Sequence, residues 1–208
     1  MHVTRPVRRA RLPSRPQQRR HRALPTERDQ PSEPADATLL ARLAADDASA
    51  LDALLGRYWS PLVMFIARLS GSPEAAEDAV QETFCRLWER RRSWRVEGSV
   101  GGLLFRLARN IAISTHRHLQ AEDRAAGIAI EHAPRHQDAL ELPDDALRAM
   151  LERAIASLPP RRREVFLLRV VHDLSYKEIG AVMGTAPQTV ANQLSHALAE
   201  LRAMLTPP

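Results

Sequence analysis

Apolar residues recur every three or four positions along most of this chain, and this spacing limits the possible folds more than any other feature. In the first stretch they are Leu39, Leu40, Leu43, Leu51, Leu54, Leu55, Tyr58, Leu62, Phe65, Ile66 and Leu69. Such spacing is the period of an α-helix with one apolar face. The 208 residues include only eight glycines and 4% aromatic residues, which are scarce for a β-protein. The sequence therefore predicts an all-α fold.

The net charge of +5 comes entirely from the beginning of the chain. Residues 1–35 hold nine arginines and three acidic residues, a net +6, so residues 36–208 carry 21 basic and 22 acidic residues, a net −1. Prolines at positions 6, 13, 16 and 25 argue against the amphipathic helix of a transit peptide, and no apolar segment follows as in a secretory signal. We expect a disordered basic arm at 1–35, or residues that precede the true start of translation.

Breaks in the periodicity divide the rest into two helical units. Helices are expected from about position 36 to 69, from 73 to about 92 and from 100 to about 118. Residues 121–142 mix charges with Pro134 and have weak periodicity, which indicates a flexible linker. Leu142 and Pro143 open a second unit. We therefore predict small helical domains at 36–120 and 143–206, joined by a linker at 121–142.

Several functions find no support in the residues. No stretch of 18 apolar residues is present, so membrane insertion is not expected. Without a phosphate loop, a nucleophile elbow or paired catalytic carboxylates, we expect neither an enzyme nor a cofactor nor a small-molecule substrate. His132 and His136 have a metal-pair spacing but no supporting cysteine, so no metal site is expected. The single cysteine, Cys85, excludes an intramolecular disulfide and is interpreted as a small buried residue.

The second unit carries the pattern of a helix-turn-helix. Leu158-Pro159-Pro160 starts a helix whose apolar run, Val165 to Leu168 with Val170 and Val171, is expected to be buried. Ser175 and Glu178 have the spacing of a capping box, and Gly184 suits the left-handed end of a short helix. The longer helix that follows has the apolar stripe Val190, Leu194, Ala197, Leu198, Leu201 and Leu205. Short helix, glycine turn and longer helix together form this motif.

The opposite face of that last helix is polar. It carries Gln188, Ala191, Asn192 and Ser195, with Gln193 and His196 at its edge. Asn and Gln side chains pair with adenine edges in a major groove, although an ordinary helical hairpin with a solvated face is the alternative. Positions 186–199 contain no Lys or Arg. Phosphate contacts would therefore come from Arg161, Arg162, Arg163, Lys177 or Arg202.

The first unit carries two charged helix faces of opposite sign. An acidic stripe after Pro73 consists of Glu74, Glu77, Asp78, Gln81 and Glu82. It is either a solvated face or a docking site for a basic partner. The next helix gathers Arg106, Arg109, Asn110, His116, Arg117 and His118. Trp94 and Arg95 precede it, and cations beside an exposed aromatic suit single-stranded nucleic acid, unless Trp94 only fills the core.

Both units together resemble the extracytoplasmic-function (ECF) group of bacterial RNA polymerase sigma factors. The segment EAAEDAVQETFCRLWERR is similar to their region 2 helix that docks on core polymerase, and GGLLFRLARNIAISTHRH to the region 2 helix that holds the −10 element. Residues 157–202 are similar to region 4, whose helix-turn-helix reads the −35 element as duplex. The resemblance covers about residues 37–206. It implies promoter recognition by a bacterial cytoplasmic protein, which a membrane-associated anti-sigma factor can hold inactive.

The resemblance also implies a role for particular residues. The polymerase-binding residues would be Asp78, Gln81 and Glu82. The opened −10 strand would be bound by Trp94, Arg95, Arg106, Arg109, Asn110 and Arg117. The −35 duplex would be bound by Lys177, Gln188, Thr189, Asn192, Gln193 and His196.

The chain departs from the family pattern at several positions, among them 191, 193 and 196, where basic residues are common and Ala, Gln and His stand here. Leu103 stands where an aromatic is usual, Ser114 near a usual Asp, and Ala186 replaces a Ser or Thr helix cap. Thr185 with Gln188 could supply the cap instead.

The alternative function is a stand-alone transcriptional regulator of the response-regulator type, which would bind duplex DNA without polymerase and would not need the acidic stripe.

Overall fold

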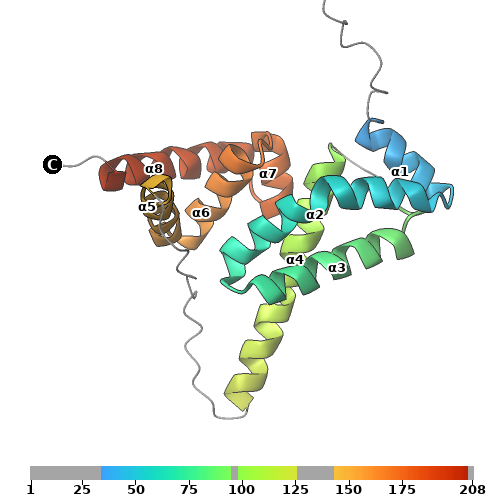
Figure 1. Ribbon diagram of the computed structural model, residues 1–208, viewed down its shortest axis with the longest axis horizontal. Coiled ribbons are helices and arrows are strands. Elements are labelled where there is room, and N and C mark those ends of the chain that lie inside the picture. Colours follow the sequence, from blue (N-terminus) through green and yellow to red (C-terminus); the bar gives the residue numbers. More distant parts are fainter. Residues whose placement is uncertain (1–33, 95–97, 126–142, 206–208) are drawn as a thin grey trace, which may run out of the picture. The chain divides into compact units, whose positions relative to one another are not determined.

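The computed structural model describes residues 34–94, 98–125 and 143–205, and its regular elements in these ranges are all helices (Figure 1). The all-α prediction is confirmed. Most of the expected basic arm, most of the expected linker, Arg95 and the pair His132 and His136 lie outside the described residues. Within the described part, no helix is both long enough and apolar enough to cross a membrane.

The described part of the first domain contains four helices. They are α1 (Asp36–Ala44), α2 (Ala48–Ser70), α3 (Pro73–Glu89) and α4 (Val100–Ala125). The first apolar run is thus two helices, because Asp46 adopts a left-handed backbone with φ 67° and the Asp47 carboxylate accepts the Ser49 amide at 3.0 Å, which caps α2. The third helix is shorter than expected, and α4 continues beyond position 118 into the expected linker.

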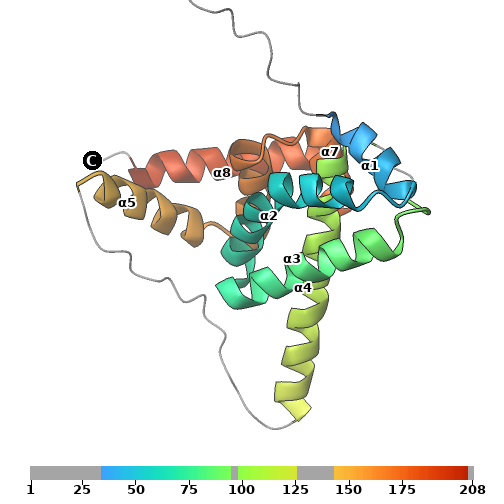
Figure 2. The same cartoon turned by 45° about the vertical axis from the view of Figure 1, so that its right-hand side comes forward.

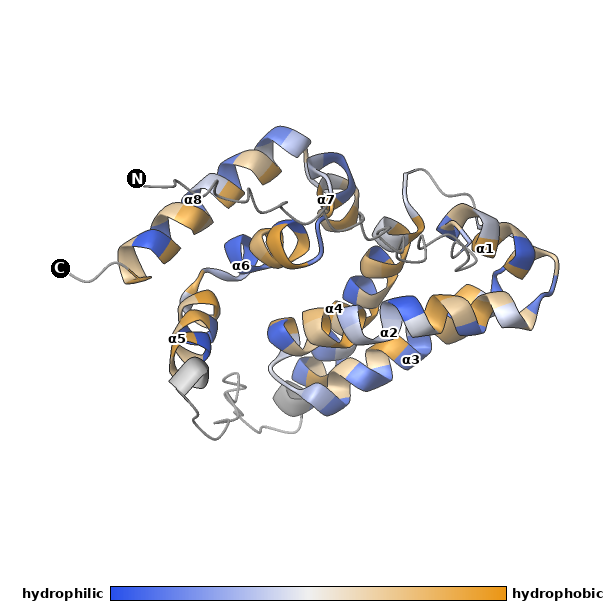
Figure 3. Ribbon diagram, turned by 45° about the horizontal axis from the view of Figure 1, so that its top comes forward, coloured by the Kyte–Doolittle hydropathy of each residue, from blue (hydrophilic) through white to orange (hydrophobic). Residues whose placement is uncertain are grey.

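Helix α2 occupies the middle of this domain and packs against α1, α3 and α4 (Figures 1 and 2). Its residues Leu54, Leu62, Phe65 and Ile66 have no exposed surface. Hydrophilic and hydrophobic residues alternate around each helix, as the colouring in Figure 3 shows. Figures 1 and 2 both show the C-terminal half of α4 extending beyond its neighbours, so that part of α4 is accessible.

Cys85 is exposed, which makes the expectation of a buried cysteine wrong. Its neighbours Phe84 and Leu87 are buried. Position 85 falls on the outer face of α3, next to the acidic stripe, because consecutive helical residues are separated by about 100° around the axis.

The described part of the second domain contains α5 (Pro143–Ser157), α6 (Pro160–Phe166), a π-helical segment η1 (Leu167–Val171), α7 (Tyr176–Met183) and α8 (Pro187–Leu205). Val165 to Leu168 are buried as expected. Val170 and Val171 are 53% and 43% exposed, so the prediction of their burial is wrong. The segment packs against α6 and α7, and this packing leaves the two valines with much of their surface exposed.

The helix-turn-helix has the predicted caps. The Ser175 hydroxyl accepts the Glu178 amide at 3.3 Å while the Glu178 carboxylate accepts the Ser175 amide at 2.8 Å. Gly184 ends α7 with a φ of 65°. Thr185 contributes to the turn through its backbone amide, which donates to the Gly180 carbonyl at 2.9 Å. Helix α8 begins at Pro187, so Ala186 and not Thr185 directly precedes it.

A close backbone approach fixes the turn of this motif. A Cβ atom at Gly180 would lie 2.7 Å from the Thr185 carbonyl oxygen, which is closer than real contacts allow. Glycine is therefore required inside α7, although it is a poor helix former. By contrast, a Cβ at Gly56 in α2 would meet nothing within 4 Å.

Replacing these two glycines by alanine should therefore have opposite effects. We expect Gly180→Ala to lower the free energy of unfolding by about 1–3 kcal/mol, because the backbone of the turn must move. Gly56→Ala should raise it by up to ~1 kcal/mol through helix propensity. Urea unfolding followed by circular dichroism measures both changes, and equal effects would contradict the close approach at Gly180.

Candidate functional site

The outer face of α3 presents the acidic stripe. Ser72 caps this helix by accepting the Ala75 amide at 3.2 Å, with Pro73 in the first turn. The stripe residues Glu74, Glu77, Asp78, Gln81 and Glu82 are all exposed, whereas Ala76, Val80, Phe84 and Leu87 are buried behind them. Arg86 donates to Glu82 at 2.6 Å. A rigid, negatively charged helix face is thus available to a basic partner.

The residues predicted for the −10 strand do not all share one face of α4. Arg106, Asn110 and Arg117 are exposed, and their spacing of four and seven places them on one side. Arg109 lies on the neighbouring side and donates from Nε and Nη2 to the Glu164 carboxylate of α6. Of the four predicted side chains on α4, three are therefore open to a ligand, and the fourth, Arg109, is bound by a protein carboxylate.

The two departures in α4 have different surroundings. Leu103 is 5% exposed and belongs to the core. Ser114 is exposed on the helix surface. An apolar side chain at position 103 thus stabilises the domain and is not placed to contact a ligand.

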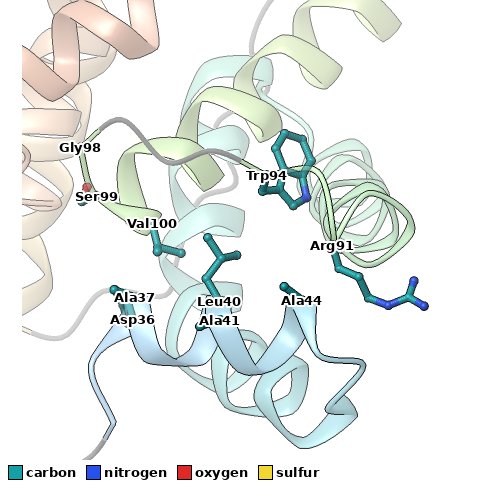
Figure 4. Close-up of a pocket in the computed structure, with 10 residues that line it drawn as sticks. All are labelled: Asp36, Ala37, Leu40, Ala41, Ala44, Arg91, Trp94, Gly98, Ser99 and Val100. Carbon is teal, nitrogen blue, oxygen red and sulfur yellow. The ribbon is translucent and has the colours of Figure 1, made fainter.

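Trp94 lies beside a cavity of about 480 Å³ between α1 and the beginning of α4 (Figure 4). Its indole N–H donates to the Leu87 carbonyl at 3.0 Å, and the ring is only partly exposed. Leu40 and Val100 also line the cavity. Trp94 therefore packs against the core and also borders the cavity. Both interpretations of this residue, as a core side chain and as part of a nucleic-acid site, thus have a structural basis. Arg95, which follows it, lies outside the described residues.

Asp46 binds the two arginines that follow α3, and one of them, Arg91, also lines this cavity. Its carboxylate accepts hydrogen bonds from Arg92 and Arg91, and these hydrogen bonds lower the pKa of Asp46 below its ordinary value. The guanidinium of Arg91 also lies 4.3 Å from the centre of the Trp88 ring. The sequence pattern did not reveal this cluster, because Asp46 and the two arginines are more than 40 positions apart.

The polar face of α8 is exposed as predicted. Gln188, Thr189, Asn192 and His196 are exposed, and Gln193 is partly buried at the edge. The Gln188 amide donates to the Asn192 side-chain oxygen at 3.2 Å, which orders the two side chains on this face. Lys177 is exposed on α7.

The candidate phosphate contacts divide into two groups. Arg161, Lys177 and Arg202 are exposed. Arg162 is paired with Glu200, and Arg163 donates to the backbone carbonyls of Ala156 and Leu158, so neither is free for phosphate. The sequence could not separate them, because three consecutive arginines point to three different sides of a helix.

Residues of α4 contact the second domain at several points. Besides Arg109 with Glu164, the rings of Phe105 and His172 have centroids 4.7 Å apart. A Cβ at Gly102 would lie 3.6 Å from Cγ of Glu178. Hydrogen bonds from Ser175 and then Ser99 lower the pKa of Glu178. Sequence patterns gave no sign of Glu164 or His172, because contacts between distant segments leave no periodic trace.

His172 is the buried titratable group of this contact. Its ring also packs edge-on against Phe65 with centroids 5.8 Å apart, and its Nε2 atom is buried without a hydrogen-bond partner among the described residues. Burial lowers the pKa of His172 to about 4, with a smaller contribution from the positive charge of Arg68. The ring is therefore held in the neutral form.

The described residues contain no group of three or more His, Cys, Asp or Glu side chains that could hold a metal ion. The arrangement consists instead of an acidic helix face, a basic helix and a polar helix-turn-helix. Such surfaces bind macromolecules through charge and hydrogen bonds.

Comparison with known proteins identifies the class. The family model for Sigma-70 region 2 matches residues 54–122, and the model for Sigma-70 region 4 matches residues 148–201. The chain is 30% identical over 160 residues to the ECF RNA polymerase sigma factor SigE of Mycolicibacterium smegmatis, covering 73% of this chain and 60% of that protein. It is 27% identical over 174 residues to the ECF RNA polymerase sigma-E factor of Salmonella typhimurium, covering 78% of this chain and 90% of that one.

Solved structures agree in fold. CnrH, in complex with the cytosolic domain of CnrY, superposes with a TM-score of 0.62 at 22% identity, over 83% of this chain and 97% of that one. The sigma factor RpoE of Bartonella quintana, in complex with the anti-sigma factor NepR, superposes with a TM-score of 0.58 at 27% identity, over 73% and 93%.

The two domains are thus those of a transcription initiation factor of the sigma-70 type, a class without enzymatic activity. The chain belongs to the ECF group of the sigma-70 family. A stand-alone regulator is not favoured, because it would leave the region 2 match at residues 54–122 unexplained.

The lowered pKa of His172 predicts a pH dependence of stability. Between about pH 6.5 and pH 4 the unfolded chain binds a proton at this ring and the folded chain does not, so stability falls as the pH falls. We expect acidification from pH 7 to pH 5 to cost the wild type about 1 kcal/mol more than His172→Phe, less than the full shift because the ring is not completely buried. Urea titrations at both pH values measure this difference, and identical pH slopes would contradict it.

Proposed function

We propose that this protein binds core RNA polymerase through its first domain and directs promoter-specific transcription initiation through both domains. The observation that carries the proposal is the match to sigma-70 regions 2 and 4, in that order, on domains that expose an acidic helix and a polar helix-turn-helix. The proposed boundaries are residues 36–120 for region 2 and 143–206 for region 4. The first of these stops short of the end of α4 at Ala125.

The polymerase contact is assigned to Asp78, Gln81 and Glu82. All three are exposed on the rigid face of α3, whose opposite face is anchored in the core. A preformed charged helix needs little reorganisation to bind, because its backbone and capping are already ordered.

Binding of the −10 strand is assigned to the loop before α4 and to α4 itself. Arg106, Asn110 and Arg117 supply exposed donors for phosphates and bases. Trp94 borders the 480 Å³ cavity, where an aromatic ring can stack on an unpaired base. Arg95 and Arg109 complete the proposed set. Arg109 requires release from Glu164 before it can contribute.

Binding of the −35 duplex is assigned to the helix-turn-helix. Gln188 and Asn192 form an ordered amide pair on the exposed face of α8, and amide side chains suit adenine edges in the major groove. Thr189, Gln193 and His196 extend this surface. Lys177 adds a positive charge for the phosphate backbone.

An anti-sigma factor is the proposed regulatory partner, at a cytoplasmic location where a membrane-bound inhibitor could hold the protein. The support is that the sigma factor RpoE of Bartonella quintana was solved in complex with the anti-sigma factor NepR.

Charge reversal on α3 tests the polymerase contact. We expect Asp78→Arg to lower co-purification of core RNA polymerase about tenfold or more, because a reversed charge in a packed interface costs at least ~1.4 kcal/mol. Asp52→Arg is the matched control, since it makes the same charge change on the exposed surface of α2. Equal binding by the two variants would show that α3 is not the polymerase-binding surface.

Two substitutions in the second domain separate base reading from phosphate binding. Asn192→Ala should reduce discrimination between the native and base-substituted −35 duplexes by about 1–3 kcal/mol. Lys177→Ala should weaken binding to all duplexes alike and lower the salt slope by about 1. Fluorescence anisotropy on promoters identified by transcript sequencing after overexpression measures both. Unchanged selectivity in Asn192→Ala would rule out direct reading by that side chain.

A further inference from the structure

An exposed tryptophan on α2 belongs neither to the acidic stripe nor to the DNA-binding surfaces. Trp59 is 36% exposed, more than any other aromatic residue in the described part of the first domain. Trp94 donates its indole N–H to Leu87, and the guanidinium of Arg91 lies over the ring of Trp88. Within the described ranges Trp59 has neither kind of partner, so its indole N–H and part of its ring are open to another molecule.

The ring of Trp59 lies at one edge of the acidic stripe. It stacks on Phe84 of α3, with ring centroids 6.4 Å apart and 25° between the planes. Gln81 precedes Phe84 by three positions, so it lies on the same side of α3, and it is exposed. Because Phe84 itself is only 4% exposed, the accessible surface passes from Gln81 on α3 to Trp59 on α2.

The turn of α2 before Trp59 carries no side chain. Gly56 lies three positions earlier on the same side of the helix, and a Cβ atom there would meet nothing within 4 Å. Glycine is a poor helix former, and no close approach by the described residues requires it at this position. The bare turn leaves room beside the indole ring for a side chain of another molecule.

An apolar ring next to carboxylates suits a cationic side chain with a long aliphatic stem. Arg and Lys pack their methylene groups on aromatic surfaces and keep the charged end in polar surroundings. The exposed carboxylates of Asp78 and Glu82 supply the opposite charge on the neighbouring helix. The combined surface of α2 and α3 is therefore complementary to a basic protein surface in both polarity and charge.

The carboxylates alone are a weak source of affinity. Exposed ion pairs contribute little in water and are screened by salt. A few large side chains supply most of the binding energy of protein interfaces, with Trp prominent among them and charges placed at the rim. Trp59 is the side chain at the edge of the stripe that has this chemistry.

We propose that Trp59, together with the bare turn at Gly56, extends the polymerase-binding surface of α3 onto α2 and is its apolar anchor. This inference deepens the proposed function and rests on it. The occupant is a basic surface of core RNA polymerase, whose Arg or Lys side chains lie across Trp59 and pair with Asp78 and Glu82. Trp59 contributes the strength of the contact, and the carboxylates contribute its orientation.

The first measurement is the Kd of purified core RNA polymerase for the immobilised protein. Trp59→Ala should weaken binding about tenfold or more, whereas Trp59→Phe, which keeps an apolar ring beside Phe84, should stay within about threefold of the wild type. Leu119→Ala is the matched control, because it removes a side chain that is 47% exposed on α4 of the same domain. Equal binding by Trp59→Ala and Leu119→Ala overturns the proposal.

Salt separates a direct contact of Trp59 from an indirect effect on the stripe. An apolar contact is not screened by ions, so Trp59→Ala should keep the wild-type dependence of the Kd on salt concentration. Asp78→Asn should reduce that dependence, because it removes one exposed charge. If Trp59→Ala reduces the salt dependence as Asp78→Asn does, the tryptophan only positions the carboxylates and is not the anchor.

A second variant guards against a folding defect in Trp59→Ala. Gly56→Gln fills the bare turn, and Gln is the better helix former, so urea unfolding should show a protein at least as stable as the wild type. Polymerase binding should nevertheless fall about fivefold or more, because the space beside Trp59 is occupied. Ala121→Gln is the control, since it adds the same side chain at an exposed site of α4. Full binding by a stable Gly56→Gln variant overturns the proposed surface.

Alkylation of Cys85 distinguishes the anchor from the polymerase contact on which it rests. Cys85 is the single cysteine of the chain and is exposed on the outer face of α3. Core polymerase should slow its reaction with N-ethylmaleimide about tenfold or more, as followed by mass spectrometry of the peptide that contains it. Full reactivity in the complex would show that α3 is not the bound face and would overturn both proposals. Protection in the wild type with unweakened binding by Trp59→Ala would overturn the anchor alone.

Discussion

The burial of α2 is the constraint that organises the first domain. Leu54, Leu62, Phe65 and Ile66 are completely covered by the surrounding helices, and each buried side chain of this kind stabilises the fold by about 1.5–3 kcal/mol. Since α3 and α4 must each turn an apolar face toward α2, their opposite faces are fixed outward. The acidic stripe and the basic helix are accessible for this reason.

In the second domain, burial of an apolar face likewise fixes which residues are displayed on the surface. The stripe through Val190, Leu194 and Ala197 is buried, which holds the amide pair of Gln188 and Asn192 on the outside of α8. The turn before α8 is set by backbone contact at Gly180 and by the left-handed Gly184. Polar residues that would read DNA are thereby carried on an ordered helix, which lowers the entropy lost on binding.

Sequence patterns predict this structure correctly where the physics is local. A cap such as Ser72 or the pair Ser175 and Glu178 involves residues three positions apart, so its pattern is visible in the chain. The exposed stripe on α3 follows from helical period in the same way. Predictions fail where the exposure or the pairing of a side chain depends on which other residues surround it in the folded protein. Cys85 is exposed, and Arg162 and Arg163 are held by neighbours inside the domain, because periodicity does not say which side of a helix is covered or by what.

The amino-acid sequence alone was enough to establish that the chain is helical, where several of its helices begin, and which charged faces they carry, because these properties depend on spacings of three and four residues. Resemblance to the ECF group then assigned roles to those faces. Which of the predicted residues are open depends on the packing of the helices. Arg106, Asn110 and Arg117 are exposed, whereas Arg109 is bound by Glu164, 55 positions further along the chain. A contact over that separation arises from how helices pack, and no local pattern encodes it.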